Sequence, residues 1–150
     1  MSYYILLDAG PLGLVTNPKA TGEPFRAAQW IYAQQQQARK NLIPEIADYE
    51  VRRELVRAGK PRGIARLNQF KIDFGYLPLT ASAMLLAAEL WAELRRQGRP
   101  NANDYALDGD VILAAQALLI QNSGHQVVIA TTNVKHLEHF IDARLWSDIT

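Results

Sequence analysis

Short apolar runs alternate along the chain with longer segments that show helical periodicity. The apolar runs predict β-strands at 3–8, 42–44, 75–79 and 126–131. Helices are predicted over 24–39, 45–58, 62–74, 80–97 and 109–122, with a turn or short helix through 141. Gly10-Pro11 is expected to turn the chain, and loops are expected at 16–23 and 101–107.

The alternation of strands and helices predicts an α/β fold with a central parallel sheet. The chain of 150 residues is long enough for a substantial core and shows no linker or internal repeat, so we expect a single domain over 1–150. In such sheets, functional groups gather at the carboxyl ends of the strands. Asp8 follows one predicted strand, and Thr131 and Asn133 end another.

Composition and charge narrow the possible functions only slightly. The hydrophobic share of 49% and charged share of 21% are those of an ordinary globular protein, and the net charge of +1 favours no class of charged partner. The absence of cysteine excludes disulfides, thiol catalysis and cysteine-ligated zinc. No apolar run is long enough to span a bilayer and no basic leader begins the chain, so a cytoplasmic protein without a membrane partner is expected.

Four acidic residues lie at positions that the predicted fold could bring together as a metal site. Asp8 ends the first strand, Glu50 lies on the 45–58 helix, and Asp108 and Asp110 open the 109–122 helix. Carboxylates brought together repel one another unless a hard cation binds them, and their oxygens suit Mg²⁺ or Mn²⁺. The pattern therefore indicates metal-dependent phosphodiester chemistry.

Purely structural explanations compete with this interpretation. Asp8 is of a type that starts turns or caps helices, and Asp108 and Asp110 stand where caps are expected. Two carboxylates in one turn nevertheless exceed what a cap needs, so the second is free to face a cation.

The 45–58 helix leaves a similar choice. Glu50 and Glu54 each have an arginine three residues on, Arg53 and Arg57, and each pair could form an ion pair on a solvated face. We favour Glu50 as the functional carboxylate because it lies nearer the start of the helix, at the expected strand edge.

Other polar side chains surround these carboxylates in the predicted fold. Thr131 and Asn133 could orient a water or a phosphate, or could form a capped turn. The three histidines are expected at the surface. A basic group could hold a phosphate backbone, with Arg53 and Arg57 as candidate substrate-binding residues. Its members are Arg52, Arg53, Arg57, Lys60, Arg62 and Arg66, followed along the chain by Arg95, Arg96 and Arg99.

Taken together, the chain resembles PIN-domain ribonucleases, and most closely the VapC-like toxins of bacterial toxin–antitoxin pairs. The parts that carry the resemblance are short, but their order and spacing are specific. They are Leu6–Leu12, Ile43–Leu55, Asp110–Ala117 and Ile129–Leu137.

The resemblance implies a three-layer α/β/α fold and a metal-dependent endoribonuclease. Asp8, Glu50 and Asp110 match the first three acidic positions of the family and would hold Mg²⁺ or Mn²⁺, while Asn133 stands where the family often has a fourth carboxylate. A neutral amide is the poorer ligand for a hard cation, and Asp108 is a candidate to compensate. The family also implies an RNA substrate, a homodimer and inhibition by a small antitoxin.

Two other functions stay open from the sequence. Asn133 favours a PIN-like module that has lost activity and binds nucleic acid or protein. An unrelated phosphatase is the third possibility, although Gly10 occupies the place where haloacid-dehalogenase-like phosphatases carry a second aspartate. The chain has neither a P-loop nor a Gly-x-Gly-x-x-Gly fingerprint, which disfavours nucleotide binding of those kinds.

Overall fold

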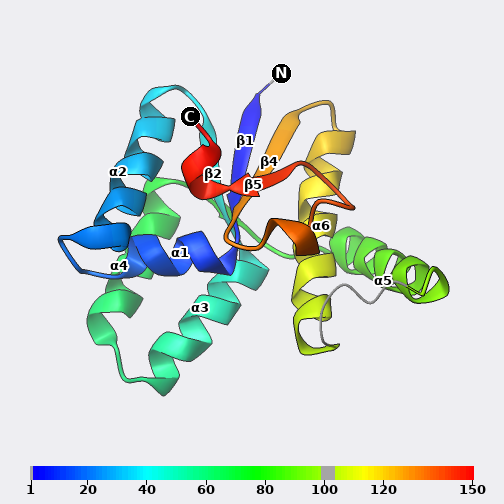
Figure 1. Ribbon diagram of the computed structural model, residues 1–150, viewed down its shortest axis with the longest axis horizontal. Coiled ribbons are helices and arrows are strands. Elements are labelled where there is room, and N and C mark those ends of the chain that lie inside the picture. The colour runs from blue at the N-terminus through cyan, green and yellow to red at the C-terminus, as the bar shows by residue number, and fades with distance from the viewer. Residues whose placement is uncertain (1, 99–103) are drawn as a thin grey trace.

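A central parallel sheet organises the computed structural model, which describes residues 2–98 and 104–150 (Figure 1). Its strand order is β3-β2-β1-β4-β5, and every neighbouring pair is parallel, as the sequence predicts. The strands are β1 (Tyr3–Leu7), β2 (Lys40–Pro44), β3 (Tyr76–Leu77), β4 (Gln126–Thr131) and β5 (Ala143–Leu145).

Helices cover both faces of this sheet. Figure 1 shows α1 to α4 on one side and α5 and α6 on the other, which confirms the three-layer α/β/α architecture. The helices are α1 (Ala9–Thr16), α2 (Gly22–Gln36), α3 (Glu45–Arg57), α4 (Pro61–Asp73), α5 (Ala81–Arg96) and α6 (Asp104–Asn122). None of the helices within the described ranges is apolar over enough length to cross a membrane.

The central strand β1 is buried on both faces. Leu7 packs with Leu12 of α1 and Ile31 of α2, whereas Leu6 packs with Leu113 of α6. Successive side chains of a strand point to opposite faces, so the continuous apolar run supplies both cores at once. The strand end that carries Asp8 is therefore held between two packed layers.

The first helix occupies the segment that was predicted to turn. α1 begins at Ala9, directly after β1, and Pro11 lies in its first turn. Proline is tolerated there because the first-turn N–H groups of a helix have no intrahelical partner. The expectation of a turn at Gly10-Pro11 was wrong for this reason.

The last long helix begins earlier than predicted. α6 starts at Asp104 and not at residue 109, so Asp108 and Asp110 lie within the helix and neither is its cap. Residues 101–103 of the expected loop lie outside the described residues, and residues 104–107 are helical. Strand β5 was not predicted, because it is three residues long and two of its side chains are exposed.

Candidate metal centre

Strand pairing brings the ends of β1 and β4 together. Leu7 pairs with Ala130, and the backbone N–H of Asp8 donates to the Ala130 carbonyl at 2.9 Å. Asp8 therefore lies beside Thr131, although 123 positions separate the two in the sequence. This juxtaposition follows from parallel pairing in register, which places equivalent strand ends at one edge.

The Asp8 carboxylate is held by two donors. Its Oδ1 accepts from the backbone N–H of Ala9 at 2.8 Å, and its Oδ2 accepts from the Thr131 hydroxyl at 2.7 Å. Asp8 thus caps α1 and still belongs to the cluster described below. Burial raises the pKa of Asp8, while the hydrogen bonds from Thr131 and Ala9 lower it.

Thr131 ends β4, and its side chain is used within the protein. Its side chain is fully buried, and its hydroxyl donates to Asp8 while accepting from the backbone N–H of Asn133 at 2.9 Å. The structure therefore shows that Thr131 positions Asp8 and the turn that carries Asn133. Its expected contact with substrate stays a prediction.

Glu50 reaches the same edge from α3. Its carboxylate lies against Gly109 of α6, where a Cβ atom would stand 3.0 Å from Glu50 Oε2. Burial raises the pKa of Glu50, the charge of Asp8 raises it further, and Arg53 opposes both effects. The side chain at 109 must be absent for Glu50 to approach α6 this closely.

Asp110 completes the group from the α6 side. Burial raises its pKa to about 7, and the charges of Asp8 and Glu50 contribute next. Its Oδ2 is buried without a hydrogen-bond partner among the described residues. His136 Nδ1 lies 3.4 Å from this oxygen, but the contact lacks the geometry of a hydrogen bond. Three carboxylates predicted from distant segments therefore interact electrostatically across one space.

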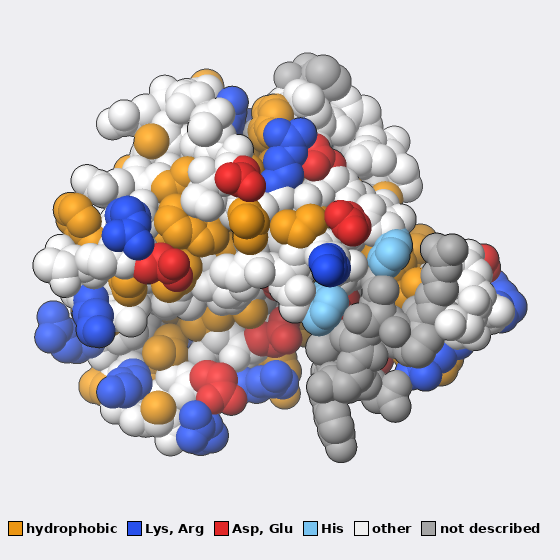
Figure 2. Space-filling model, in the orientation of Figure 1, with side chains coloured by type: hydrophobic (Ala, Val, Ile, Leu, Met, Phe, Trp, Pro, Cys, Tyr) orange, Lys and Arg blue, Asp and Glu red, His pale blue; other side chains and the backbone are white. Residues whose placement is uncertain are grey.

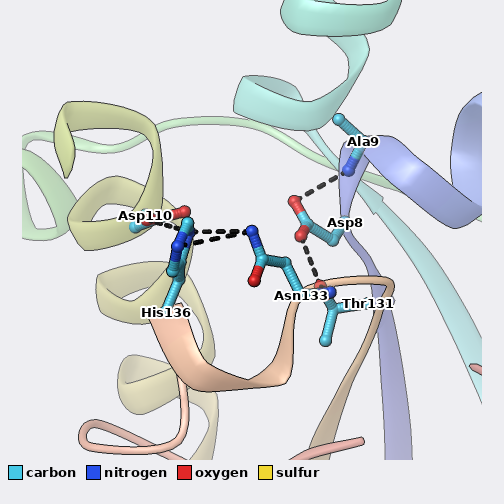
Figure 3. A network of polar contacts seen from close by, with 6 residues as sticks. All are labelled: Asp8, Ala9, Asp110, Thr131, Asn133 and His136. Atoms are coloured by element: carbon cyan, nitrogen blue, oxygen red, sulfur yellow. Dashed lines mark hydrogen bonds and ion pairs between the residues drawn. The ribbon is translucent and has the colours of Figure 1, made fainter. Parts of the chain in front are cut away.

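Asn133 and His136, which follow β4 in the chain, border the site on a further side. Asn133 Nδ2 lies 3.0 Å from His136 Nδ1, and Figure 3 shows Asn133 between Asp8 with Thr131 on one side and Asp110 with His136 on the other. The sequence predicted His136 at the surface, yet its side chain is only 26% exposed. The spacing of Asn133 and His136 could have indicated their mutual contact, because residues three apart in a 3₁₀ turn lie on one side, but it does not indicate the approach of His136 to Asp110.

The donors fit a hard divalent cation. Among the residues that the structure describes, no group of three acidic or histidine side chains closes around a point as a ready-made metal cage. The charges of Asp8 and Glu50 instead act on Asp110, and one buried oxygen of Asp110 lacks a partner within the described part of the chain. Oxygen donors in this arrangement suit an ion that retains several waters, as Mg²⁺ does. Asp8, Glu50 and Asp110 are the residues that would hold it.

Asp108 is not brought into this group. Its side chain is exposed and lines a hollow against α5 together with Met84 and Trp91. Within a helix, residues two apart do not share a face, so Asp110 and Asp108 cannot both point at Glu50. The structure thus gives the expected ligand role of Asp108 no support.

Two arginines predicted to bind substrate differ in their surroundings. Arg57 forms the ion pair with Glu54 that the sequence allowed, with 2.8 Å between Nη2 and Oε2. Arg53 lies over the Tyr49 ring, 5.2 Å from its centre, and is close enough to Glu50 to favour its charged form. Of the two, Arg53 is the cation beside the carboxylate cluster.

Other members of the basic group serve the fold. Arg52 donates to both carboxylate oxygens of Asp48, at 3.2 and 2.9 Å. Arg66 donates to the carbonyls of Val15 and Thr16 at the end of α1, at 2.8 and 3.2 Å. Both guanidinium groups are thus engaged in contacts that stabilise the fold.

Solved structures share this fold. The chain superposes on "VapBC2 from Rickettsia felis bound to a DNA fragment from their promoter" with a TM-score of 0.70 and 16% identity, covering 95% of this chain and 98% of that one. VapBC-1 from nontypeable Haemophilus influenzae and DNA-bound VapBC from Salmonella typhimurium each give a TM-score of 0.69, at 17% and 20% identity, covering 97% of this chain and 99% of theirs. No protein-family model and no curated protein matches the sequence.

These superpositions extend over nearly the whole of each chain, so they define the architecture. The chain has the PIN-domain fold of VapC.

Proposed function

We propose that this protein is a metal-dependent endoribonuclease whose centre is formed by Asp8, Glu50 and Asp110. The observation that carries the proposal is their electrostatic coupling: each carboxylate is partly buried, burial raises the pKa of both Glu50 and Asp110, and the charge of Asp8 raises both further. Such mutual repulsion is relieved by a divalent cation. The PIN-domain fold supports the choice of nuclease chemistry.

Each side chain then has a role in hydrolysis of a phosphodiester. When bound, Mg²⁺ or Mn²⁺ would activate water and neutralise charge on the scissile phosphate. Thr131 keeps Asp8 oriented, and Gly109 leaves space for Glu50. Arg53, exposed beside Glu50, would contact the phosphate backbone, and Asn133 would orient water or phosphate.

We further propose that a small antitoxin partner inhibits the protein. The structures with the same fold are VapBC complexes, in which the matching chain is solved together with other molecules. A homodimer is proposed on the resemblance alone. Co-expression with the product of an adjacent open reading frame, followed by co-purification, tests the partner.

Cleavage of a mixed substrate set tests the activity. Wild type and Asp8→Asn are incubated with single-stranded RNA, structured RNA, single-stranded DNA and a generic phosphate ester, in Mg²⁺, Mn²⁺ or EDTA. The proposal expects cuts in RNA that need the metal and Asp8. Turnover of the ester without RNA cleavage would instead support the alternative that the protein is a phosphatase.

A binding module without activity is the second candidate, and Asn133 in place of a fourth carboxylate is the observation that favours it. A Mn²⁺ titration followed by thermal melting separates the two. Stabilisation of wild type but not of Asp8→Asn supports the enzyme, since a ligand that binds only the folded state raises its stability. No effect of metal on either protein supports the module.

A further inference from the structure

Two neighbouring cavities lie along α1 and α3. The first begins at Glu50, and the second lies farther from the carboxylates. One has a volume of about 520 Å³ and is lined by Glu50 and Arg57 of α3 and by Gly10 of α1, among others. The other, of about 490 Å³, lies at the ends of α1 and α3 and the start of α4. Gly13, Thr16, Leu55 and Lys60 line both, so the two form one continuous groove.

The far end of this groove is basic. Lys19, Lys60 and Arg62 line the second cavity, and no acidic side chain is among the described residues of its wall. Within the described part of the chain, no ion pair or side-chain hydrogen bond involves any of these three cations. They differ in this from Arg52, Arg57 and Arg66, which are held by acidic or carbonyl partners.

The groove floor is open because one helix position has no side chain. A Cβ atom added at Gly13 would meet nothing within 4 Å. Gly13 lies inside α1, where glycine is less favourable than alanine for helix stability. Its presence therefore needs a reason other than the helix, and free access along the groove supplies one.

We infer that the groove over Gly13 guides a single-stranded RNA away from the carboxylates and that Lys19, Lys60 and Arg62 bind its backbone phosphates in the basic cavity. This inference rests on the proposed function. From Glu50 to Arg57, α3 advances about 10 Å along its axis at about 1.5 Å per residue, and Lys60 lies beyond. The cavity thus contacts the strand at a distance from the cut and adds affinity without reading bases.

Figure 2 agrees with this path. In that view, Lys and Arg side chains gather over the end of the molecule where α3 and α4 lie, with fewer acidic side chains among them. The net charge of the chain is only +1, so this gathering is local. Local positive charge of this kind is the electrostatic feature by which proteins bind nucleic-acid phosphates.

Binding of a fluorescent single-stranded RNA, measured by anisotropy in EDTA at several salt concentrations, tests the inference without catalysis. Lys60→Gln and Lys60→Gln/Arg62→Gln are compared with Lys40→Gln, which removes one charge at the amino end of β2, as Lys60→Gln does in the cavity. We expect the double variant to bind about tenfold more weakly at low salt, and the slope of log K against log salt to fall by about 0.7 for each lost phosphate contact. Lys40→Gln should bind as wild type.

Obstruction of the groove provides a second test that leaves the charge unchanged. Gly13→Leu should weaken RNA binding because its side chain enters the open floor, whereas Gly13→Ala should keep binding and raise the melting temperature. Thermal melts of all variants show that they fold.

Two results would overturn the inference. One is equal RNA binding by Lys60→Gln/Arg62→Gln and Lys40→Gln. The other is loss of binding to polyglutamate in the double variant while RNA binding persists, which would assign the cavity to an acidic protein partner. Failure of the proposed function is seen separately, as no metal-dependent cleavage by wild type, because the binding measurement needs no cleavage.

Discussion

Replacement of Asp110 by Asn should change the pH dependence of stability in the metal-free protein. Burial and the charges of Asp8 and Glu50 raise the folded-state pKa of Asp110 from 3.8 to about 7. The folded state therefore holds a proton that the unfolded chain releases at lower pH. The contribution of Asp110 to stability falls as pH rises from about 4 to 7 and stays low above that range.

The size of the effect follows from the shift. One pKa unit corresponds to about 1.4 kcal/mol, so a rise from 3.8 to about 7 is worth at most about 4 kcal/mol. The amide introduced by Asp110→Asn carries no charge at any pH and escapes this cost. The variant should therefore gain stability over wild type at pH 8, and the gain should shrink toward pH 4.

Urea unfolding in EDTA at pH 4.5 and pH 8 measures the difference in unfolding free energy between the two proteins. Asp108→Asn, an equal change on an exposed side chain of the same helix, is the matched control. Mn²⁺ at pH 8 should reverse the ranking, because it stabilises wild type and not Asp110→Asn. An equal free-energy difference between wild type and Asp110→Asn at both pH values would refute the electrostatic reasoning.

Three further changes test contacts that support the site or the fold around it. Thr131→Val should lower stability by about 1 kcal/mol, since a buried hydrogen bond to Asp8 is lost, and should also weaken Mn²⁺ binding; unchanged Mn²⁺ affinity would argue against its positioning role. Gly109→Ala should keep the fold but displace Glu50 by a few tenths of an ångström and weaken Mn²⁺ binding several-fold, which calorimetric titration measures. Arg66→Met should lower the free energy of unfolding by about 2 kcal/mol, because two carbonyls at the end of α1 lose their donor; a change within error would show that water replaces it.

Much of the fold could be predicted because the apolar runs mark the strands. Strand β1 is buried on both faces and reads as a continuous apolar segment, and its alternation with helices indicates a parallel sheet. The short strand β5 could not be found in this way, since its three residues form no pattern. The start of α6 was placed too late because Asp108 resembles a cap, a local feature that helix propagation overrides.

The site could be predicted in part for a related reason. Asp8 is fixed by the strand it follows, and Glu50 by its place in the first half of α3, a helix that leaves the same edge. The burial of Thr131 and the approach of His136 to Asp110 depend on packing between segments, which no spacing in the sequence specifies. The choice between Asp108 and Asp110 likewise needed the direction of each side chain on α6.

RNA cleavage by wild type, Asp110→Asn and Asp108→Asn, measured under single-turnover conditions with Mn²⁺, tests the central claim most directly. We predict metal-dependent cleavage by wild type, its loss in Asp110→Asn and its retention in Asp108→Asn. Equal cleavage by wild type and Asp110→Asn, or none by metal-loaded wild type on any RNA, would contradict a metal centre of Asp8, Glu50 and Asp110.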